Sequence, residues 1–311
     1  MTGRKNSSNQ EVEGSNPSGL TIIVKEFHSV FMIIRSSEIK KRQEIALNLN
    51  KKIVRIIKSD SQLKKLIKVW LWHSSLVTGE GGEKYDIDLA AFVDVKKYSK
   101  LFKKAIWISE RISSKLNLKN KDDPYFVADV LGPRRTIGIH WEHEDVPHIG
   151  IHFYTFNDLK YNVQCLKRLH KCKMSDFNEI FVRTIIIEAI PFVDSEGIFS
   201  EAKGLSEHLP KIIKEERIDN CIALLETFLY KSKDRWSISK LPTYKKLQID
   251  RILIPAIYSI NNVYQGTEKR FKTDLKKFRG RLSKDLIEFT FKKRTTKLAS
   301  KILLQLKEYK I

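Results

Sequence analysis

Two aspartates, Asp86 and Asp88, are the residues of this chain whose type and spacing are best suited to chemistry. Ile87 stands between them, and Leu89 and Ala91 continue an alternating apolar pattern. Side chains alternate between the two faces of a β-strand, so both carboxylates point the same way, roughly 7 Å apart. Such a pair repels unless a cation neutralises it, and Mg²⁺ is usually held by one or two carboxylates together with substrate phosphates. The pair therefore predicts a Mg²⁺ site.

A loop of serines and glycines precedes the two aspartates and contains Ser74, Ser75, Gly79, Gly81 and Gly82. With this loop, residues 71–89 resemble the signature of the DNA polymerase β-like nucleotidyltransferase superfamily. In that signature an apolar strand runs into Gly-Ser or Gly-Gly, and a second strand carries Asp-x-Asp. The resemblance implies that the serines and glycines bind the triphosphate of a nucleotide while the aspartates bind Mg²⁺.

One position departs from the family. His73 stands where the family has glycine, so a close approach of the backbone to the triphosphate needs another source of backbone freedom. Gly79, Gly81 and Gly82 can supply it, because glycine adopts backbone conformations that are closed to other residues.

Members of the family generally carry a third acid on a later strand, where it completes the metal site and takes the proton of the attacking hydroxyl. The segment 151–159 resembles that strand, and the position that matches the acid is His152, with Gly150 one same-face step earlier. Neither residue is a carboxylate. Three alternatives follow: neutral His152 serves as the base, Glu142 or Glu144 reaches across from the partner strand, or nothing replaces the acid and nucleotide is bound without turnover.

The hairpin predicted over residues 135–156 concentrates side chains that can bind metals: His140, Glu142, His143, Glu144, Asp145, His148 and His152. Their spacing is not that of a zinc motif. Strand alternation is expected to divide them between opposite faces of the sheet. We therefore predict a surface hairpin with polar edges here.

The chain is strongly basic, because 58 Lys and Arg against 37 Asp and Glu give a formal net charge of +21 over 311 residues. Such an excess favours phosphate-rich partners such as nucleotide or nucleic acid. A general compositional preference for lysine would give the same excess with no partner. From Lys269 to Ile311 there are 15 Lys and Arg against 4 Asp and Glu. This segment is either a nucleic-acid face or a solvated helix.

Cysteine usage and hydropathy predict a cytoplasmic protein that does not enter membranes. Cys165, Cys172 and Cys221 are too few and too odd in number for a disulfide framework. No apolar run approaches the roughly 20 residues of a membrane-spanning helix. The first 19 residues are rich in Ser, Asn and Gly and lack the apolar stretch of a signal peptide.

Hydrophobic periodicity indicates how the chain is organised. Apolar residues recur at helical spacing over 22–67 and 98–116, and strands are predicted at 69–72, 86–93 and 125–130. Helix dominates after the hairpin and is expected to be interrupted at prolines, including Pro255.

Three parts are expected: a disordered tail over residues 1–19, an α/β nucleotidyltransferase-like domain over 20–160 with a mixed sheet and flanking helices, and a mostly helical domain over 161–311. The second half adds a weaker resemblance. Residues 190–198 are similar to the segment that links the catalytic and helical domains in antibiotic-type nucleotidyltransferases, and residues 224–230 to a helix beside the substrate cleft.

The function implied by the resemblance is metal-dependent transfer of a nucleoside monophosphate from a nucleoside triphosphate to a hydroxyl acceptor. Asp86, Asp88 and His152 are the candidate catalytic residues. The acceptor class is open between a drug, a protein hydroxyl and an RNA end. The alternative is a catalytically impaired nucleotide- or RNA-binding protein on the same fold, and metal dependence of triphosphate consumption separates the two.

Overall fold

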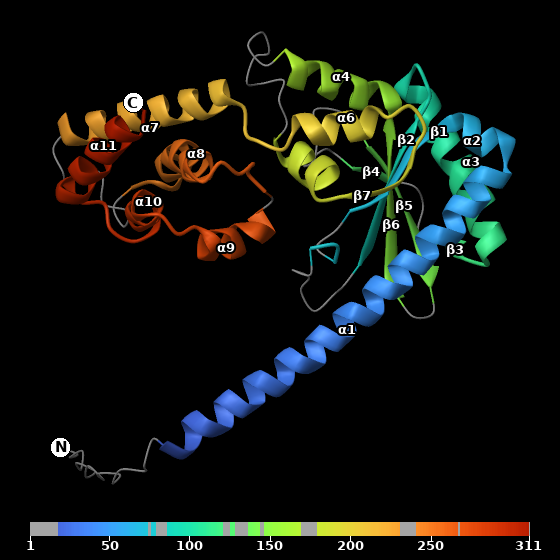
Figure 1. The fold of residues 1–311 in the computed structure, drawn as a ribbon, viewed down its shortest axis with the longest axis horizontal. Helices are drawn as coiled ribbons and strands as arrows, with labels where there is room; N and C mark the ends of the chain where they lie inside the picture. Colours follow the sequence, from blue (N-terminus) through green and yellow to red (C-terminus); the bar gives the residue numbers. More distant parts are fainter. Residues whose placement is uncertain are drawn as a thin grey trace, which may run out of the picture.

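The computed structural model describes residues 18–73, 76–78, 86–120, 125–127, 136–143, 146–168, 179–230, 241–266 and 268–310. Within these ranges one mixed sheet carries helices on both faces, and a group of helices follows at the C-terminal end (Figure 1). This arrangement confirms the predicted fold class, an α/β sheet with flanking helices followed by a mostly helical region.

The sheet has the strand order β3-β5-β6-β2-β1-β7, and β4 also pairs with β5. Strand β2 lies between β1, to which it is antiparallel, and β6, to which it is parallel. The other pairings are antiparallel. The strands are β1 (Ile67–Trp72), β2 (Ile87–Val93), β3 (Lys119–Asn120), β4 (Tyr125–Val127), β5 (Thr136–His143), β6 (Val146–Thr155) and β7 (Ile190–Asp194).

The first face of the sheet is covered by α1 (Ser18–Ser59) and α3 (Tyr98–Leu116), with the short α2 (Ser61–Leu66) between α1 and β1. A first-face core of strand and helix residues is buried there. Two buried tryptophans are satisfied by helix side chains: Trp70 Nε1 donates to Asn50 at 2.9 Å, and Trp141 Nε1 donates to Ser109 at 2.7 Å. These hydrogen bonds fix both helices on the sheet, because a buried indole N–H needs a partner.

The second face of the sheet is covered by α4 (Phe156–Lys167), α5 (Glu179–Phe181), the π-helix η2 (Val182–Ile187) and α6 (Ile198–Leu205). Ala90, Phe92 and Tyr154 are strand residues of this second-face core. Helix α4 begins with a capping box in which Thr155 and Asp158 bond each other's backbone N–H groups. The second-face core stops short of Asp88, which leaves that end of the sheet to polar residues.

The helical part consists of α7 (Lys211–Tyr230), α8 (Thr243–Ile260), α9 (Glu268–Lys277), α10 (Arg281–Phe291) and α11 (Thr296–Lys310). It has its own helical core, which includes Leu225, Phe228, Leu253 and Phe289. Helix α8 runs through Pro255, so the predicted interruption at this proline is wrong.

The sheet extends beyond the expected domain boundary near residue 160. Residues 190–194 form β7, which pairs with β1, and Gly197 makes the following turn with φ of 70°. The segment 190–198, expected as a linker, is therefore an edge strand and a turn. The second-face core includes Ile213 and the helical core begins at Ile218, so the cores change within α7.

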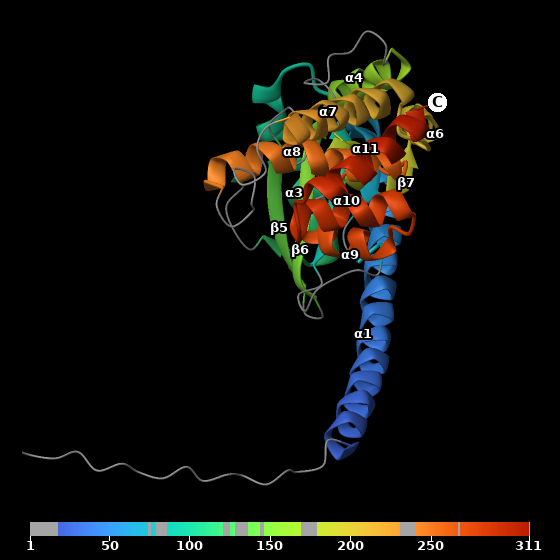
Figure 2. The ribbon, with the colours of Figure 1, turned by 90° about the vertical axis from the view of Figure 1, so that its left-hand side faces the viewer.

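Helix α1 extends away from the body of the molecule at its N-terminal end (Figures 1 and 2). It begins at Ser18, within the tail predicted over residues 1–19, while residues 1–17 lie outside the described residues. None of the helices in the described ranges combines the length and apolarity that a membrane crossing requires.

Candidate active site

The two aspartates lie at the start of β2, beside the end of β1. Ile87 is fully buried in the first-face core, and alternation gives Asp86 and Asp88 on either side of it the opposite face. Both aspartates are half-buried. The main-chain N–H of His73 donates to the Asp88 carbonyl at 2.9 Å, which ties the end of β1 to this pair.

The residues predicted to bind the triphosphate lie outside the described residues, and their role stays a prediction: Ser74, Ser75, Gly79, Gly81 and Gly82. Residues 76–78 between them are described. Leu76 is buried in the first-face core, and its carbonyl accepts a hydrogen bond from Gln43 Nε2 of α1 at 2.8 Å. Helix α1 thus anchors the segment that follows β1.

Gly150, not His152, is the residue of β6 directly opposite Asp88. His152 lies opposite Ala90, one pair further along the sheet. A Cβ atom at Gly150 would lie 3.2 Å from Asp88 Oδ1 and 3.7 Å from His140 Cδ2. The Asp88 carboxylate and the His140 imidazole therefore border the space where a side chain at position 150 would begin, so a carboxylate there would crowd both.

Three histidines of the hairpin share the second face with Asp88. His140 of β5 pairs with Gly150, and His148 and His152 stand two residues to either side of Gly150 on β6. The His140 and His148 ring centroids are 3.7 Å apart. The expected division of the hairpin's metal-binding side chains between two faces does not separate these three, because the register pairs even-numbered with even-numbered positions and so gathers them on one face.

His73, the residue that follows β1, lies next to His152 of this group. The His73 and His152 ring centroids are 5.5 Å apart. Within the described part of the chain, His73 Nε2 and His152 Nδ1 are buried without a hydrogen-bond partner. Buried polar atoms are normally satisfied, so open nitrogen atoms on two neighbouring rings point to a partner supplied by a ligand, water or another segment.

Burial keeps both imidazoles neutral. Burial, followed by the neighbouring His140 and His148, lowers the pKa of His152 to about 4. Burial, followed by His152 and Arg270, holds the pKa of His73 well below its usual value. At neutral pH these two side chains can accept a proton or a hydrogen bond, and they add no positive charge beside Asp88.

The structure does not place either alternative acid of the partner strand, Glu142 or Glu144, in the site. Glu142 is exposed and stands opposite Lys119 of β3, while Glu144 lies outside the described residues. Across the ranges that the structure describes, no three His, Cys, Asp or Glu side chains are placed to hold a metal ion together. A pair of carboxylates without a third protein ligand fits Mg²⁺ that shares its coordination with substrate phosphates.

A buried charge network connects this end of the sheet to the helical part. In η2 the backbone N–H of Glu188 bonds the Arg183 carbonyl at 3.0 Å, a five-residue step that brings the two side chains together. Arg183 Nε donates to Glu188 Oε1 at 3.0 Å, and Arg270 of α9 pairs with the same oxygen. Glu188 lies two residues before Ile190, which pairs with Trp72 at the end of β1, so this ion pair places Arg270 of α9 near the end of β1.

Asp274 of α9 is the centre of the network. It accepts hydrogen bonds from Arg183 Nη1 at 2.7 Å, from Arg183 Nη2 at 2.8 Å and from the Tyr258 hydroxyl at 2.7 Å. Burial alone would lower the pKa of Arg183, but Asp274 and Glu188 raise it above its usual value, so the guanidinium stays charged. A Cβ atom at Gly266 would lie 2.9 Å from Arg183 Nη1, so a larger residue here would force the paired guanidinium to shift.

A second buried pair joins α5 to α7. Arg217 donates to both carboxylate oxygens of Glu179, at 2.7 Å and 2.6 Å, and the backbone N–H of Gln265 donates to the same carboxylate at 3.3 Å. Bidentate pairs of this kind fix orientation as well as distance. Together the two networks set the helical part in one position beside the sheet. Sequence reasoning missed Arg270 and Glu188, because no local motif connects them to the aspartates.

Comparison with known proteins gives weak matches. No protein-family model and no curated protein sequence matches the chain. Among solved structures, terminal uridylyl transferase 4 from Trypanosoma brucei with bound GTP is similar over 68% of this chain and 63% of its own, at 9% identity and a TM-score of 0.25. CdnC from E. coli MS115-1 with ATP is similar over 87% of this chain and 92% of its own, at 12% identity and a TM-score of 0.29. Similarity at this level is too weak to carry a functional inference.

Proposed function

We propose that this chain transfers a nucleoside monophosphate from a nucleoside triphosphate to a hydroxyl acceptor. The observation that carries the proposal is the pair Asp86 and Asp88 at the start of β2. Both are half-buried, and they lie on the face of the sheet opposite to the one where Ile87 is buried. Two carboxylates in this position need a cation to offset their repulsion. The end of the second face around them offers neutral imidazoles and lies beyond the apolar core, which suits a polar substrate.

Asp86 and Asp88 would hold Mg²⁺, with triphosphate oxygens as further ligands. The bound ion would neutralise phosphate charge that develops as pyrophosphate leaves. Arg270 supports the same assignment, because its ion pair with Glu188 places a guanidinium near the end of β1, where Ile190 pairs with Trp72. A guanidinium suits phosphate oxygens through paired hydrogen bonds.

His152 is the candidate base. In the transfer the acceptor oxygen bonds to the α-phosphorus, the bond to pyrophosphate breaks, and the hydroxyl proton passes to a base. The pKa of His152, about 4, leaves the imidazole unprotonated at neutral pH, with Nδ1 lacking a partner in the described part of the chain. An ordinary aspartate has a pKa of about 3.9, so His152 matches the basicity of the acid that it would replace.

A nucleotide-binding protein without turnover is the second candidate function. It is favoured by one observation, that the position opposite Asp88 is Gly150 and carries no acid. Nucleotide would then bind through the same aspartates, and no pyrophosphate would be released.

Pyrophosphate release tests the proposal. The wild-type protein is incubated with Mg²⁺, each nucleoside triphosphate and a cell extract as the source of acceptor. Asp86→Asn should abolish release, and His152→Ala should lower turnover by about 10²-fold or more with little change in nucleotide affinity. Asp94→Asn is the matched control, because Asp94 is an exposed aspartate just beyond the other end of β2.

Each outcome has a defined meaning. Release that is unchanged by Asp86→Asn would refute the catalytic assignment. Nucleotide binding by the wild type without release under any condition would favour the second candidate function. Turnover indifferent to residue 152 would remove His152 as the base and leave the assignment of the aspartates intact.

A further inference from the structure

The segment from the middle of α9 to the start of α10 carries a cationic surface. Six basic side chains are exposed on residues 272–284, and we call them the α9–α10 surface: Lys272, Lys276, Lys277, Arg279, Arg281 and Lys284. Within the described part of the chain, Lys272, Lys276, Arg279, Arg281 and Lys284 form no ion pair. These charges lie on the second half of α9, on the short connection that follows it and on the start of α10.

The acids of this region are turned inward. Asp274 is the one acid within residues 272–284, and it is buried in the pair with Arg183. The next acid, Asp285, is also buried and binds Lys301 at 2.8 Å. A compositional preference for lysine would leave both signs of charge on the surface. Here the fold buries both carboxylates in ion pairs, so the surface attracts anions more strongly than the number of charged residues in the segment indicates.

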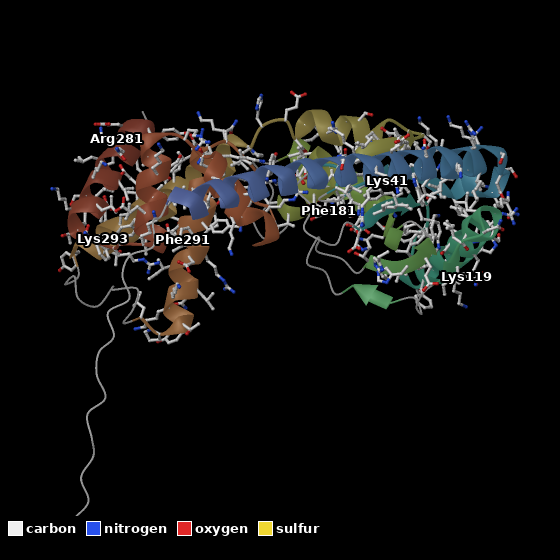
Figure 3. All side chains as sticks on the ribbon, turned by 90° about the horizontal axis from the view of Figure 1, so that it is seen from below. Lys41, Lys119, Phe181, Arg281, Phe291 and Lys293 are labelled. Atoms are coloured by element: carbon white, nitrogen blue, oxygen red, sulfur yellow. The ribbon has the colours of Figure 1, made fainter. Side chains whose placement is uncertain are left out.

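This surface begins next to the candidate active site. Arg270, two residues before Lys272, pairs with Glu188, which lies two residues before Ile190, the partner of Trp72 at the end of β1. Figure 1 shows α9 on the side of the helical part that faces the sheet, with α10 beyond it. Figure 3 shows Arg281 near the end of the molecule that is remote from Lys119 of the sheet. The α9–α10 surface therefore begins near the site at α9 and continues to Arg281, away from the sheet.

We propose that the α9–α10 surface binds the phosphate backbone of a single-stranded nucleic acid, whose terminal hydroxyl is the acceptor at Asp86 and Asp88. This inference rests on the proposed function for the role of that hydroxyl, while the binding surface stands on its own. A single strand fits because its end must reach residues on a partly covered sheet face. Several exposed cations without exposed acids among residues 272–284 match the repeated negative charge of a phosphate backbone.

An anionic membrane is the competing partner for a cationic surface. Peripheral membrane binding usually adds apolar side chains that enter the lipid boundary. Among the described residues, no large apolar side chain is exposed between positions 272 and 284. The surface therefore offers charge without an apolar anchor, which favours nucleic acid.

The test is fluorescence anisotropy of a labelled, unstructured 20-nucleotide RNA with the full chain, over a range of KCl concentrations. For about four phosphate contacts the logarithm of the association constant should fall against the logarithm of salt with a slope of about −3. Lys276→Glu with Arg281→Glu should weaken binding about tenfold or more and reduce that slope by roughly 1.4. Lys51→Glu with Lys52→Glu, on exposed positions of α1, makes the same change in net charge and should leave affinity within about twofold.

Several outcomes would overturn the inference: no RNA binding at low salt, equal loss in both double variants, or binding of phosphatidylserine-containing vesicles without binding of RNA. Asp88→Asn separates this inference from the proposed function. It should bind RNA like the wild type and release no pyrophosphate. Wild-type RNA binding without turnover would refute the proposed function alone, and turnover with a non-nucleic acceptor but no RNA binding would refute this inference alone.

Discussion

Replacing Asp274 by asparagine tests how firmly the helical part is fixed to the sheet. The carboxylate accepts two hydrogen bonds from Arg183 and one from Tyr258. Asparagine keeps one acceptor but turns an amide N–H₂ toward the guanidinium and removes the negative charge. Arg183 would then stay buried with Glu188 as its remaining carboxylate partner among the described residues.

The expected cost is large because the pair is buried. Removing one partner of a buried ion pair typically costs about 3–5 kcal/mol, since the other charge is left without compensation. For a chain of this length that loss corresponds to a fall in melting temperature of roughly 5–8 °C. Urea unfolding followed by circular dichroism measures the free energy of unfolding directly.

A matched surface pair and a double variant complete the test. Glu226→Gln removes a partner of Lys307, in a pair whose side chains are each about half exposed, and should cost no more than about 1 kcal/mol. Arg183→Met combined with Asp274→Asn should recover part of the loss, because no unpaired buried charge remains. A loss below about 1 kcal/mol for Asp274→Asn alone would refute the view that this pair holds the two parts together.

Three further predictions concern the site and its support. His152 binds a proton near pH 6.5 in the unfolded chain but only near pH 4 in the folded chain, so the folded state is favoured above pH 6.5. As the pH falls from 6.5 to about 4, the free energy of unfolding should decrease by about 3 kcal/mol. His152→Gln should remove this pH dependence. Gly150→Ala should weaken Mg²⁺-dependent nucleotide binding in calorimetry, because the added methyl lies 3.2 Å from Asp88 Oδ1. Asn50→Leu should cost about 1–3 kcal/mol in urea unfolding, because it leaves the buried Trp70 N–H without its acceptor.

Each of these predictions has a control. His208→Gln removes an exposed imidazole, and an equal flattening of the pH dependence would contradict the assignment to His152. Gly204→Ala adds a methyl with no atom within 4 Å, and an equal loss of nucleotide affinity would contradict the crowding of Asp88. Unchanged stability in Asn50→Leu would show that another group satisfies Trp70.

Local patterns predicted the elements well, because periodicity reports which face of a segment is buried. The helix predicted over 98–116 is α3 (Tyr98–Leu116), and the predicted strands at 69–72 and 86–93 correspond to β1 and β2. The same alternation placed Ile87 in the core and the aspartates opposite it. The mixed sheet and the helical second half followed from the order of these elements.

The pairing of strands and the packing of helices were harder to predict from the sequence. The metal-binding side chains of the hairpin were expected to be divided between the two faces of the sheet, but the sequence does not state which residues of β5 and β6 stand opposite each other. The register His140 to Gly150 decides that question. Pro255 was expected to interrupt a helix, but α8 continues because its neighbours Leu253 and Ala256 are buried in the helical core and hold it there.

Long-range contacts had no sequence signal at all. Arg270 reaches the end of β1 because Glu188, at the end of η2, binds it. That contact depends on how α9 packs against η2, and the nearest sequence feature was a general excess of lysine and arginine. The same holds for the inward orientation of Asp274, which makes the α9–α10 surface uniformly positive.

The central claim is that Asp86 and Asp88 bind a nucleoside triphosphate together with a divalent cation. Titration calorimetry of the full chain with a nucleoside triphosphate, in Mg²⁺ and in chelator, tests it most directly. The expected result is binding in Mg²⁺ that is lost in chelator and in Asp86→Asn, because carboxylates and triphosphate repel without the ion. Asp94→Asn should bind like the wild type. Equal affinity in Mg²⁺ and in chelator would contradict the claim.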